Sequence, residues 1–328
     1  MWQGAYPPQA IFSRRKFRKV LLNPPKFEPG HWCGAGKLWF DPWDEEFWLT
    51  SRPRAGAELR GYALEIYRSQ DGENYSLAWC ISKEEISSIC GQTVKSIEGT
   101  QILRDPLTGR YMLYISVDVS ERRWETYLMS ADDPSGPWVG EGFVLRRDAE
   151  YDSAEARDPT IDIVDGRYIC LYKARAAGAN VVHTALALSR DGRNWVKLGV
   201  PTVNGVKQQN YLLLYGSILA GCMGPVFIGT VTREVIKDAA LTDTFAAYTI
   251  DHRGMNLETI FEAKWKPGSI YEHPVYPIHT YAGVAYDYAK NRWLMWIEAV
   301  DPTASKELGL NLEVDRLLLY VSPARAFK

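Results

Sequence analysis

The segment Ser69–Tyr75 (SQDGENY) recurs in closely related form at Ser189–Trp195 (SRDGRNW), and both copies fit the pattern S-x-D-G-x-N-aromatic. A related turn, SADDPSGPW, lies between them at residues 130–138, and a weaker copy, IDHRG, begins at residue 250. The four copies are therefore spaced by about 60 residues, and a fixed period predicts one structural unit that is used several times in succession.

Short apolar segments rich in aromatic and β-branched residues accompany these turns. An aspartate at the start of a turn accepts hydrogen bonds from backbone N–H groups, and glycine supplies a positive φ. Apolar runs of four to eight residues between such turns favour strands over helices. Clear examples are residues 46–51, 110–116, 167–172 and 292–297.

Several strands in each of about five units predict an all-β fold, a five-bladed β-propeller with four-stranded antiparallel blades. We expect one domain over residues 1–328, with an N-terminal extension of about residues 1–30. The strand that closes the ring is expected from residues 19–22 or from the chain end near residues 317–322.

Helices are expected to be few. Residues 83–90 are predicted to form one, because Ser82 and Glu85 make an S-x-x-E capping box and Gly91 can end the helix. A second helix is expected at residues 233–240.

The composition excludes several classes of protein. The chain has 38 basic and 40 acidic side chains, without the basic excess that a nucleic-acid binder needs. It also lacks an apolar run long enough to span a membrane. The five cysteines form no C-x-x-C pair, so neither a zinc site nor a disulfide framework is expected. The N-terminal basic run has no apolar segment beside it, which predicts a cytoplasmic protein. The oligomeric state stays open.

Aromatic residues are abundant, with 12 Trp, 19 Tyr and 10 Phe. Strands favour aromatic side chains, and flat aromatic rings also stack on sugars. The abundance of aromatic residues is therefore compatible both with a β-rich core and with carbohydrate binding.

In a propeller we expect the catalytic residues around the central channel, where the innermost strand of each blade begins. Alignment of the five units places Gly34, Glu98, Asp158, Asn210 and Thr280 at this position. Two of these residues are carboxylates, and cleavage of a glycosidic bond uses one carboxyl group as acid and another as base or nucleophile. We assign Glu98 as the general acid and Asp158 as the base or as a residue that tunes the pKa of its partner. The alternative is that Asp158 is a turn residue before a proline and Glu98 a solvated strand end.

The blade pattern, the S-x-D-G-x-N-W turn and the sequence Arg157-Asp158-Pro159 resemble those of the five-bladed β-propeller glycosidases of families 43, 32 and 130. The resemblance implies acidic residues at one end of the propeller axis and activity on glycosidic bonds. In the xylosidase-like group it implies an Asp, an Asp and a Glu from the first three blades. Here Gly34 stands at the first of these positions, and Glu98 and Asp158 follow in the opposite order of residue types.

Further candidates lie near the predicted channel. Glu272, in a loop that leads into the last unit, is a candidate third catalytic acid. We expect a site without metal or cofactor. The alternative is that His273 or His279 binds an axial metal ion or a phosphate. The candidates for binding substrate are aromatic, cationic or polar side chains at the ends of strands or in the adjoining loops: Trp32, Arg54, Asp118, Arg157, Arg175 and His273.

The sequence therefore predicts a glycoside hydrolase that acts on a small oligosaccharide or glycoside, with inversion at the anomeric carbon. Two alternatives remain. One is a glycoside phosphorylase of the mannoside-phosphorylase type, with Arg54, Arg175 and His273 around the phosphate. The other is a non-catalytic propeller that binds sugar.

Overall fold

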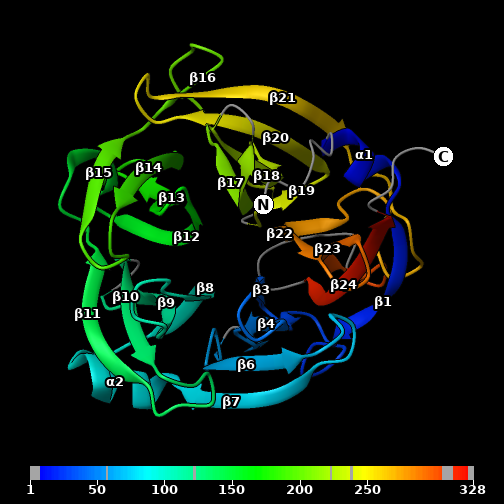
Figure 1. The fold of residues 1–328 in the computed structure, drawn as a ribbon, viewed down its shortest axis with the longest axis horizontal. Helices are drawn as coiled ribbons and strands as arrows, with labels where there is room; N and C mark the ends of the chain where they lie inside the picture. The colour runs from blue at the N-terminus through cyan, green and yellow to red at the C-terminus, as the bar shows by residue number, and fades with distance from the viewer. Residues whose placement is uncertain are drawn as a thin grey trace.

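The computed structural model describes residues 8–56, 58–120, 123–221, 224–236, 239–304 and 313–323. Figure 1 shows sheets arranged side by side around a central axis, with one edge of each sheet at the centre and the other at the rim. No helix among the described residues is long and apolar enough to cross a membrane. The prediction of an all-β protein is confirmed.

The strands pair into four sheets. The first sheet, in spatial order, contains β3 (Ala35–Asp41), β4 (Glu46–Ser51), β6 (Ala63–Ser69) and β7 (Ser76–Ser82). The third contains β17 (Leu213–Gly221), β18 (Gly224–Thr232), β20 (Thr244–Asp251), β21 (Asn256–Lys264) and the short β16 (Thr202–Val203).

The second sheet has eight strands and consists of two consecutive antiparallel meanders. They meet through a single parallel pair, Trp124 with Glu155. The first meander is β8 (Ser96–Arg104), β9 (Tyr111–Asp118), β10 (Trp124–Ala131) and β11 (Val139–Leu145). The second is β12 (Glu155–Val164), β13 (Arg167–Arg175), β14 (His183–Ser189) and β15 (Trp195–Gly199).

The fourth sheet joins the two ends of the chain. Its main strands are β22 (Ile278–Asp287), β23 (Arg292–Val300), β24 (Val314–Pro323) and β1 (Lys16–Leu22), and β2 (His31–Trp32), β5 (Arg54–Ala55) and β19 (Leu241–Thr242) extend it. The N-terminal strand β1 lies antiparallel to the C-terminal strand β24, so both predicted closing segments belong to the same sheet. Figure 1 shows this as blue β1 beside red β24.

The innermost strands form a closed ring. β3, β8, β12 and β17 contact one another in this order, β17 contacts β22, and β22 contacts β3. The apolar core lies between neighbouring units and not inside one sheet. For example, Trp48 of β4 belongs to the same buried cluster as Leu113 of β9, and Leu49 of β4 to the same cluster as Leu294 of β23. Each unit therefore buries its faces only against its neighbours, which holds the inner strands together at the axis.

The two best copies of the repeated turn have the same hydrogen bonds. Asp71 Oδ1 accepts from the N–H groups of Glu73 and Asn74 at 2.9 and 2.8 Å. The equivalent bonds to Asp191 have the same lengths. Burial acts to raise the pKa of both aspartates, but these hydrogen bonds outweigh it and lower the pKa. The turn chemistry inferred from the sequence is therefore confirmed.

Helix is scarce, as expected. α2 (Lys83–Cys90) has the predicted capping box of Ser82 and Glu85, and Gly91 ends it with φ 67°. A short helix α1 (Pro8–Ser13) and a 3₁₀ turn η1 (Glu150–Asp152) complete the described helices. The helix predicted at residues 233–240 is wrong for the described residues of that segment, where Ile236 forms an antiparallel bridge with Ala239.

Candidate active site

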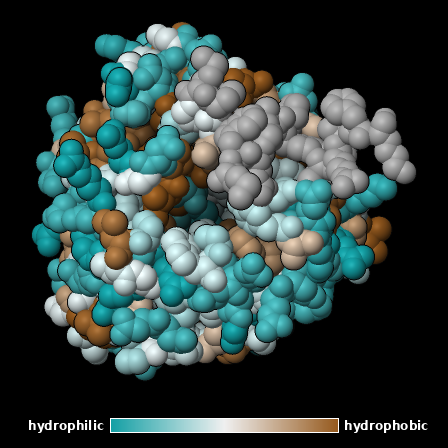
Figure 2. Space-filling model, viewed as in Figure 1, coloured by the Kyte–Doolittle hydropathy of each residue, from teal (hydrophilic) through white to brown (hydrophobic). Residues whose placement is uncertain are grey.

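Four of the innermost strands are irregular near their first residues. The register with the next strand shifts between Ala35 and Leu38, between Glu98 and Thr100, between Arg157 and Thr160, and between Ile278 and Ala282. Gly34, Asp158 and Thr280 have φ values of 65°, 50° and 57°. Such bulges redirect side chains and are frequent beside active sites. Figure 2 shows a hollow near the middle of one face of the ring.

Glu98 lies at the bulge of β8 and is 7% exposed. Its Oε2 is 2.9 Å from Nη2 of Arg52, and its Oε1 is 3.5 Å from Nη2 of Arg60. Burial acts to raise the pKa of Glu98, but the positive charges of Arg52 and Arg157 outweigh it and hold the pKa at about 2. Glu98 is therefore ionised at neutral pH, which does not fit the general-acid role predicted for it.

Asp158 follows Arg157 on β12 and is 1% exposed. Its Oδ1 accepts a hydrogen bond of 3.0 Å from the N–H of Gly99, and its Oδ2 is 2.8 Å from Nη1 of Arg157. Its own N–H donates to Oγ of Ser116 at 2.8 Å. A non-glycine residue in the left-handed region costs roughly 1–3 kcal/mol, so these contacts must hold Asp158 in place.

Ser116, on β9, links the strands that carry the two carboxylates. Its hydroxyl donates to the carbonyl of Gly99 at 2.8 Å and accepts from the N–H of Asp158. Arg52 and Arg157 both act electrostatically on Glu98 and on Asp158. The structure therefore brings Glu98 and Asp158 to the same end of the ring.

Gly34 occupies the position where the resemblance implies an aspartate. A Cβ atom at Gly34 would lie 1.9 Å from the carbonyl oxygen of Arg52. No side chain fits there without displacement of the Arg52 backbone. The guanidinium group of Arg52, which is 1% exposed, instead faces Glu98 from this side.

A second charged group surrounds Glu155, at the start of β12. Its carboxylate lies 2.9 Å from Arg157, 3.4 Å from Lys173 and 2.7 Å from Arg175. Burial acts to raise the pKa of Glu155, and the three cations outweigh it and lower the pKa. The Arg157 guanidinium also lies 4.4 Å from the ring of Trp124. Arg157 is therefore shared between Glu155 and Asp158.

Two other predicted ligands, Trp32 and Arg54, lie in the interior. Trp32 is 1% exposed and packs edge-on against His279 at 4.5 Å, so its ring is not an open platform for sugar. The guanidinium of Arg54 lies 4.2 Å from the Trp32 ring. Burial, with the nearby charge of Arg60, lowers the pKa of Arg54 to about 10.

The described residues that could hold a metal ion are His279, Glu298 and Asp315, whose ligand atoms lie within 4.8 Å of one another. They come from three adjacent strands of the fourth sheet, β22, β23 and β24, of which β22 also belongs to the inner ring. Nδ1 of His279 is 2.5 Å from Oδ2 of Asp315. Arg52 acts electrostatically on both Glu298 and Asp315, which supplies positive charge without a metal.

The structure places Glu272 and His273 in hydrogen-bonded turns near the start of the fourth sheet. Glu272 accepts hydrogen bonds from Trp265, Gly268, Ser269 and Tyr320. His273 Nδ1 accepts from the N–H groups of Val275 and Tyr276, within a turn. Both side chains therefore stabilise their own loop.

Two further expectations concern single positions. Asp118 is 8% exposed at the end of β9, in register with Ser96 and Trp124. Asn210 lies before β17 and is exposed, so it does not occupy the channel position. In the fourth unit Tyr215, on β17, lies near Asp158 instead.

The sequence reasoning missed Ser116, Tyr215 and Tyr281. Tyr281 follows the aligned position Thr280 directly, so an alignment that allowed for a bulge would have found it. Ser116 and Tyr215 gave no comparable signal.

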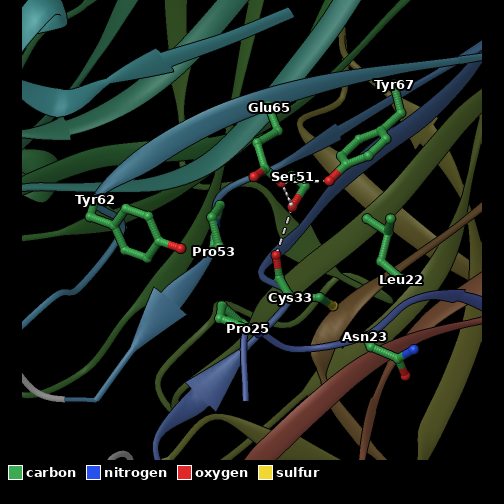
Figure 3. Close-up of a pocket in the computed structure, with 9 residues that line it drawn as sticks. All are labelled: Leu22, Asn23, Pro25, Cys33, Ser51, Pro53, Tyr62, Glu65 and Tyr67. Carbon is green, nitrogen blue, oxygen red and sulfur yellow. Dashed lines mark hydrogen bonds between the residues drawn. The ribbon is translucent and has the colours of Figure 1, made fainter. Parts of the chain in front are cut away.

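A polar cavity of about 210 Å³ lies beside the first unit. Figure 3 shows Ser51 at its centre, bonded to the carbonyl of Cys33 at 2.7 Å and to Glu65 at 3.4 Å, and Tyr67 bonded to Glu65 at 2.8 Å. Ser51 and Pro53, which line it, flank Arg52 in the sequence. The cavity therefore lies next to the segment that carries Arg52.

No family model matches this sequence, and a search of curated proteins finds no match. Solved structures do match over nearly the whole chain. A family 117 glycoside hydrolase from the marine bacterium Zobellia galactanivorans is 15% identical, with a TM-score of 0.55, and covers 94% of this chain and 90% of its own. An N-acetylgalactosamine deacetylase from F. plautii, in complex with blood group B trisaccharide, is 12% identical, with a TM-score of 0.64 and coverages of 94% and 95%.

A β-1,2-mannobiose phosphorylase from Listeria innocua is 12% identical, with a TM-score of 0.59 and coverages of 95% and 96%. At these identities the likeness concerns the fold. The fold is that of the propeller glycosidases and related enzymes, which confirms the resemblance seen in the sequence. The subfamily is not resolved.

Proposed function

We infer that the protein is a five-bladed β-propeller glycoside hydrolase that cleaves a glycosidic bond in a small oligosaccharide or glycoside. Five blades are obtained when the two meanders of the eight-stranded sheet are counted separately, since a single residue pair joins them. The closed ring of β3, β8, β12, β17 and β22 supports this count.

The observation that carries the proposed activity is the convergence of Glu98 and Asp158 at one end of that ring. Two carboxylates on neighbouring inner strands supply the acid and the base, or the acid and the nucleophile, of a glycosidase. The likeness to a family 117 glycoside hydrolase supports the same activity.

The surroundings of the two carboxylates favour a reversal of the roles assigned from sequence. Glu98 faces Arg52 and Arg60, and a pKa of about 2 keeps it ionised, as a base or a nucleophile must be. Asp158 has one arginine partner, Arg157, which it shares with Glu155. With Glu98 proposed as the ionised base or nucleophile, Asp158 is the other carboxyl group at this end of the ring, and we assign it as the general acid.

The stereochemical course is proposed to be inversion, with Glu98 activating a water molecule. Proton NMR of the first-formed sugar distinguishes this from retention, because the anomer released at early times differs. A retaining course would assign Glu98 as nucleophile.

Phosphorolysis is the less favoured alternative. It places Arg54, Arg175 and His273 around a phosphate, but Arg54 lies against the ring of the buried Trp32 and donates to the carbonyl of Gly56. Arg175 is paired with Glu155, and His273 belongs to a separate turn. Because a β-1,2-mannobiose phosphorylase is among the matching structures, the experiment also tests for phosphorolysis.

The experiment measures turnover of a panel of 4-nitrophenyl α- and β-glycosides and short oligosaccharides. Each substrate is assayed without inorganic phosphate and at two phosphate concentrations that differ by about 10-fold. Turnover that is independent of phosphate supports hydrolysis, and turnover that requires phosphate supports phosphorolysis. Sugar binding without turnover would overturn the enzymatic proposal in favour of a binding propeller. The proposal includes a cytoplasmic location, supported by the free thiols of Cys33, Cys80, Cys90 and Cys170.

A further inference from the structure

Tyr281 lies at the bulge of β22, directly after Thr280, whose φ is 57°. The register between β22 and β23 is interrupted from Ile278 to Ala282, so Tyr281 falls inside the irregular segment. Its side chain is 4% exposed. The fifth inner strand therefore presents an aromatic residue where the second and third present Glu98 and Asp158.

The charged residues around Tyr281 are the two carboxylates themselves and the arginines that act on them. Asp158, Arg52, Glu98 and Arg157 all act electrostatically on its hydroxyl group, with Asp158 the strongest of the four. The Arg52 guanidinium lies 5.3 Å from the centre of its ring. Tyr215 packs edge-on against the ring at 4.3 Å. The orientation of Tyr281 is therefore fixed by neighbours that belong to the candidate active site.

The hydroxyl group of Tyr281 makes no hydrogen bond to any residue that the structure describes. Buried tyrosines normally find a partner. Tyr114 donates to Gly192, Tyr168 to Asp105 and Tyr172 to Asp152. The hydroxyl groups of Tyr75, Tyr215 and Tyr248 also lack a partner among the described residues, so it is the position of Tyr281 beside the two carboxylates that distinguishes it. An oriented donor without an acceptor, next to two carboxylates at the ring centre, is arranged for an acceptor that arrives with the substrate.

We propose that the Tyr281 hydroxyl donates a hydrogen bond to an oxygen atom of the substrate sugar beside Asp158 and is a catalytic residue of the enzyme. This inference rests on the proposed glycosidase function and extends it to the fifth inner strand. The ligand group it recognises is a sugar hydroxyl or ring oxygen, which can accept the bond.

The environment makes Tyr281 a donor and not a nucleophile. Burial raises its pKa well above the usual value, and the negative charge of Asp158 raises it further. The phenol therefore keeps its proton throughout the working pH range. No bond to the tyrosine oxygen forms or breaks in this role. Its contribution is a fixed dipole directed at an oxygen whose charge changes in the transition state.

The test uses Tyr281→Phe, which keeps the ring and its contact with Tyr215 but removes the donor. Removal of one such donor typically lowers the rate by about 100-fold to 1,000-fold, so we expect kcat/KM to fall by that factor, mainly through kcat. The melting temperature should stay close to that of the wild type, since the ring contacts remain. Tyr248→Phe, at a buried tyrosine of β20 on the outer part of the fourth unit, is the control and should retain activity.

The outcomes separate this inference from the proposed function. If the wild type hydrolyses glycosides and Tyr281→Phe is within about threefold of it in kcat/KM, the inference is wrong and the function stands. If the wild type hydrolyses nothing on the panel, the function is wrong. Saturation-transfer NMR with xylose, arabinose, mannose and galactose then decides whether Tyr281 contacts sugar. Equal binding by wild type and variant, or no binding by either, overturns the contact.

A second substitution covers the case in which Tyr281→Phe is unstable. Tyr281→Met also lacks the hydroxyl and fills the same space with a flexible side chain. A loss of kcat in a folded Tyr281→Met protein supports the inference, and retained kcat overturns it.

Discussion

The N–H of Gly99 donates a hydrogen bond of 3.0 Å to Oδ1 of Asp158. Gly99 follows Glu98 directly, so this bond fixes the distance between the two strands that carry the proposed reacting groups. A Cβ atom at Gly99 would lie 2.8 Å from the same oxygen, which explains why glycine stands there. The position of Asp158 is therefore coupled to the backbone beside Glu98.

The first prediction concerns the two carboxylates. Glu98→Gln and Asp158→Asn should each lower kcat/KM by at least about 1,000-fold, because each removes a group that transfers a proton or stabilises charge in the transition state. Steady-state kinetics on the best substrate of the panel measure this. Glu84→Gln, at an exposed position of α2, is the matched control and should be fully active. Near-normal turnover in either site variant would remove that residue from the mechanism.

The second prediction concerns pH. The folded-state pKa of Glu98 is about 2 against an ordinary value of 4.5, because its arginine partners outweigh the effect of burial. A group whose pKa is lowered by folding stabilises the fold, and this stabilisation is complete when the pH is above the ordinary pKa of 4.5. The stabilisation is lost as the pH falls from 4.5 towards 2. Glu98→Gln should therefore melt below the wild type at pH 7, and the gap should narrow at pH 3. Thermal melts at both pH values test this, and a constant gap would contradict it.

The third prediction concerns Ser116. Its hydroxyl serves Gly99 and Asp158 at once, so Ser116→Ala leaves two buried backbone groups without a partner. Loss of a buried partner costs about 1–3 kcal/mol, and we expect a loss of stability in that range together with a lower kcat. Chemical denaturation and kinetics measure both effects. Unchanged kcat in a destabilised protein would show that Ser116 supports the fold without positioning Asp158.

The fourth prediction compares two glycines with similar φ angles. Gly34 has φ 65° and Gly56 has φ 72°, but only at Gly34 does a Cβ meet another atom, 1.9 Å away on Arg52. Gly56→Ala should cost only the strain of the left-handed conformation, about 1–2 kcal/mol. Gly34→Ala should cost more and also reduce activity, since it displaces the segment that pairs with Glu98. Equal losses at both glycines would contradict the proposed role of the Gly34 contact.

The fifth prediction concerns Glu272. All its hydrogen bonds come from its own loop and from Tyr320 of β24, so Glu272→Gln should lower the melting temperature and leave kcat and its pH dependence unchanged. A large fall in kcat at unchanged stability would instead support the catalytic role predicted for Glu272 from the sequence.

Local sequence patterns predicted correctly those structural features that involve only residues close together in the chain. The turns at Asp71 and Asp191 and the capping box of Ser82 and Glu85 involve residues two or three positions apart, and all were predicted correctly. The position of Glu98 and Asp158 followed from the repeat, because equivalent residues of equivalent units lie at the same end of a ring.

The sequence did not predict surroundings that depend on neighbours distant along the chain. Glu272 was read as an acid for the channel, but Tyr320 and the backbone of residues 268 and 269 surround it. The surroundings of Glu98 do not fit a general acid, because Arg52, which lies 46 positions earlier (98 − 52), approaches within 2.9 Å. Neither contact has a sequence signature.

The amino-acid order alone determined the strand-and-turn unit, its repetition and the level along the axis at which the acidic residues appear, since each follows from short-range backbone and side-chain preferences. Only the folded ring decided which charges meet. Packing of each unit against its neighbours places Arg52, Arg157 and Tyr281 around Glu98 and Asp158, and these contacts set the protonation and orientation of the groups on which the proposed chemistry depends.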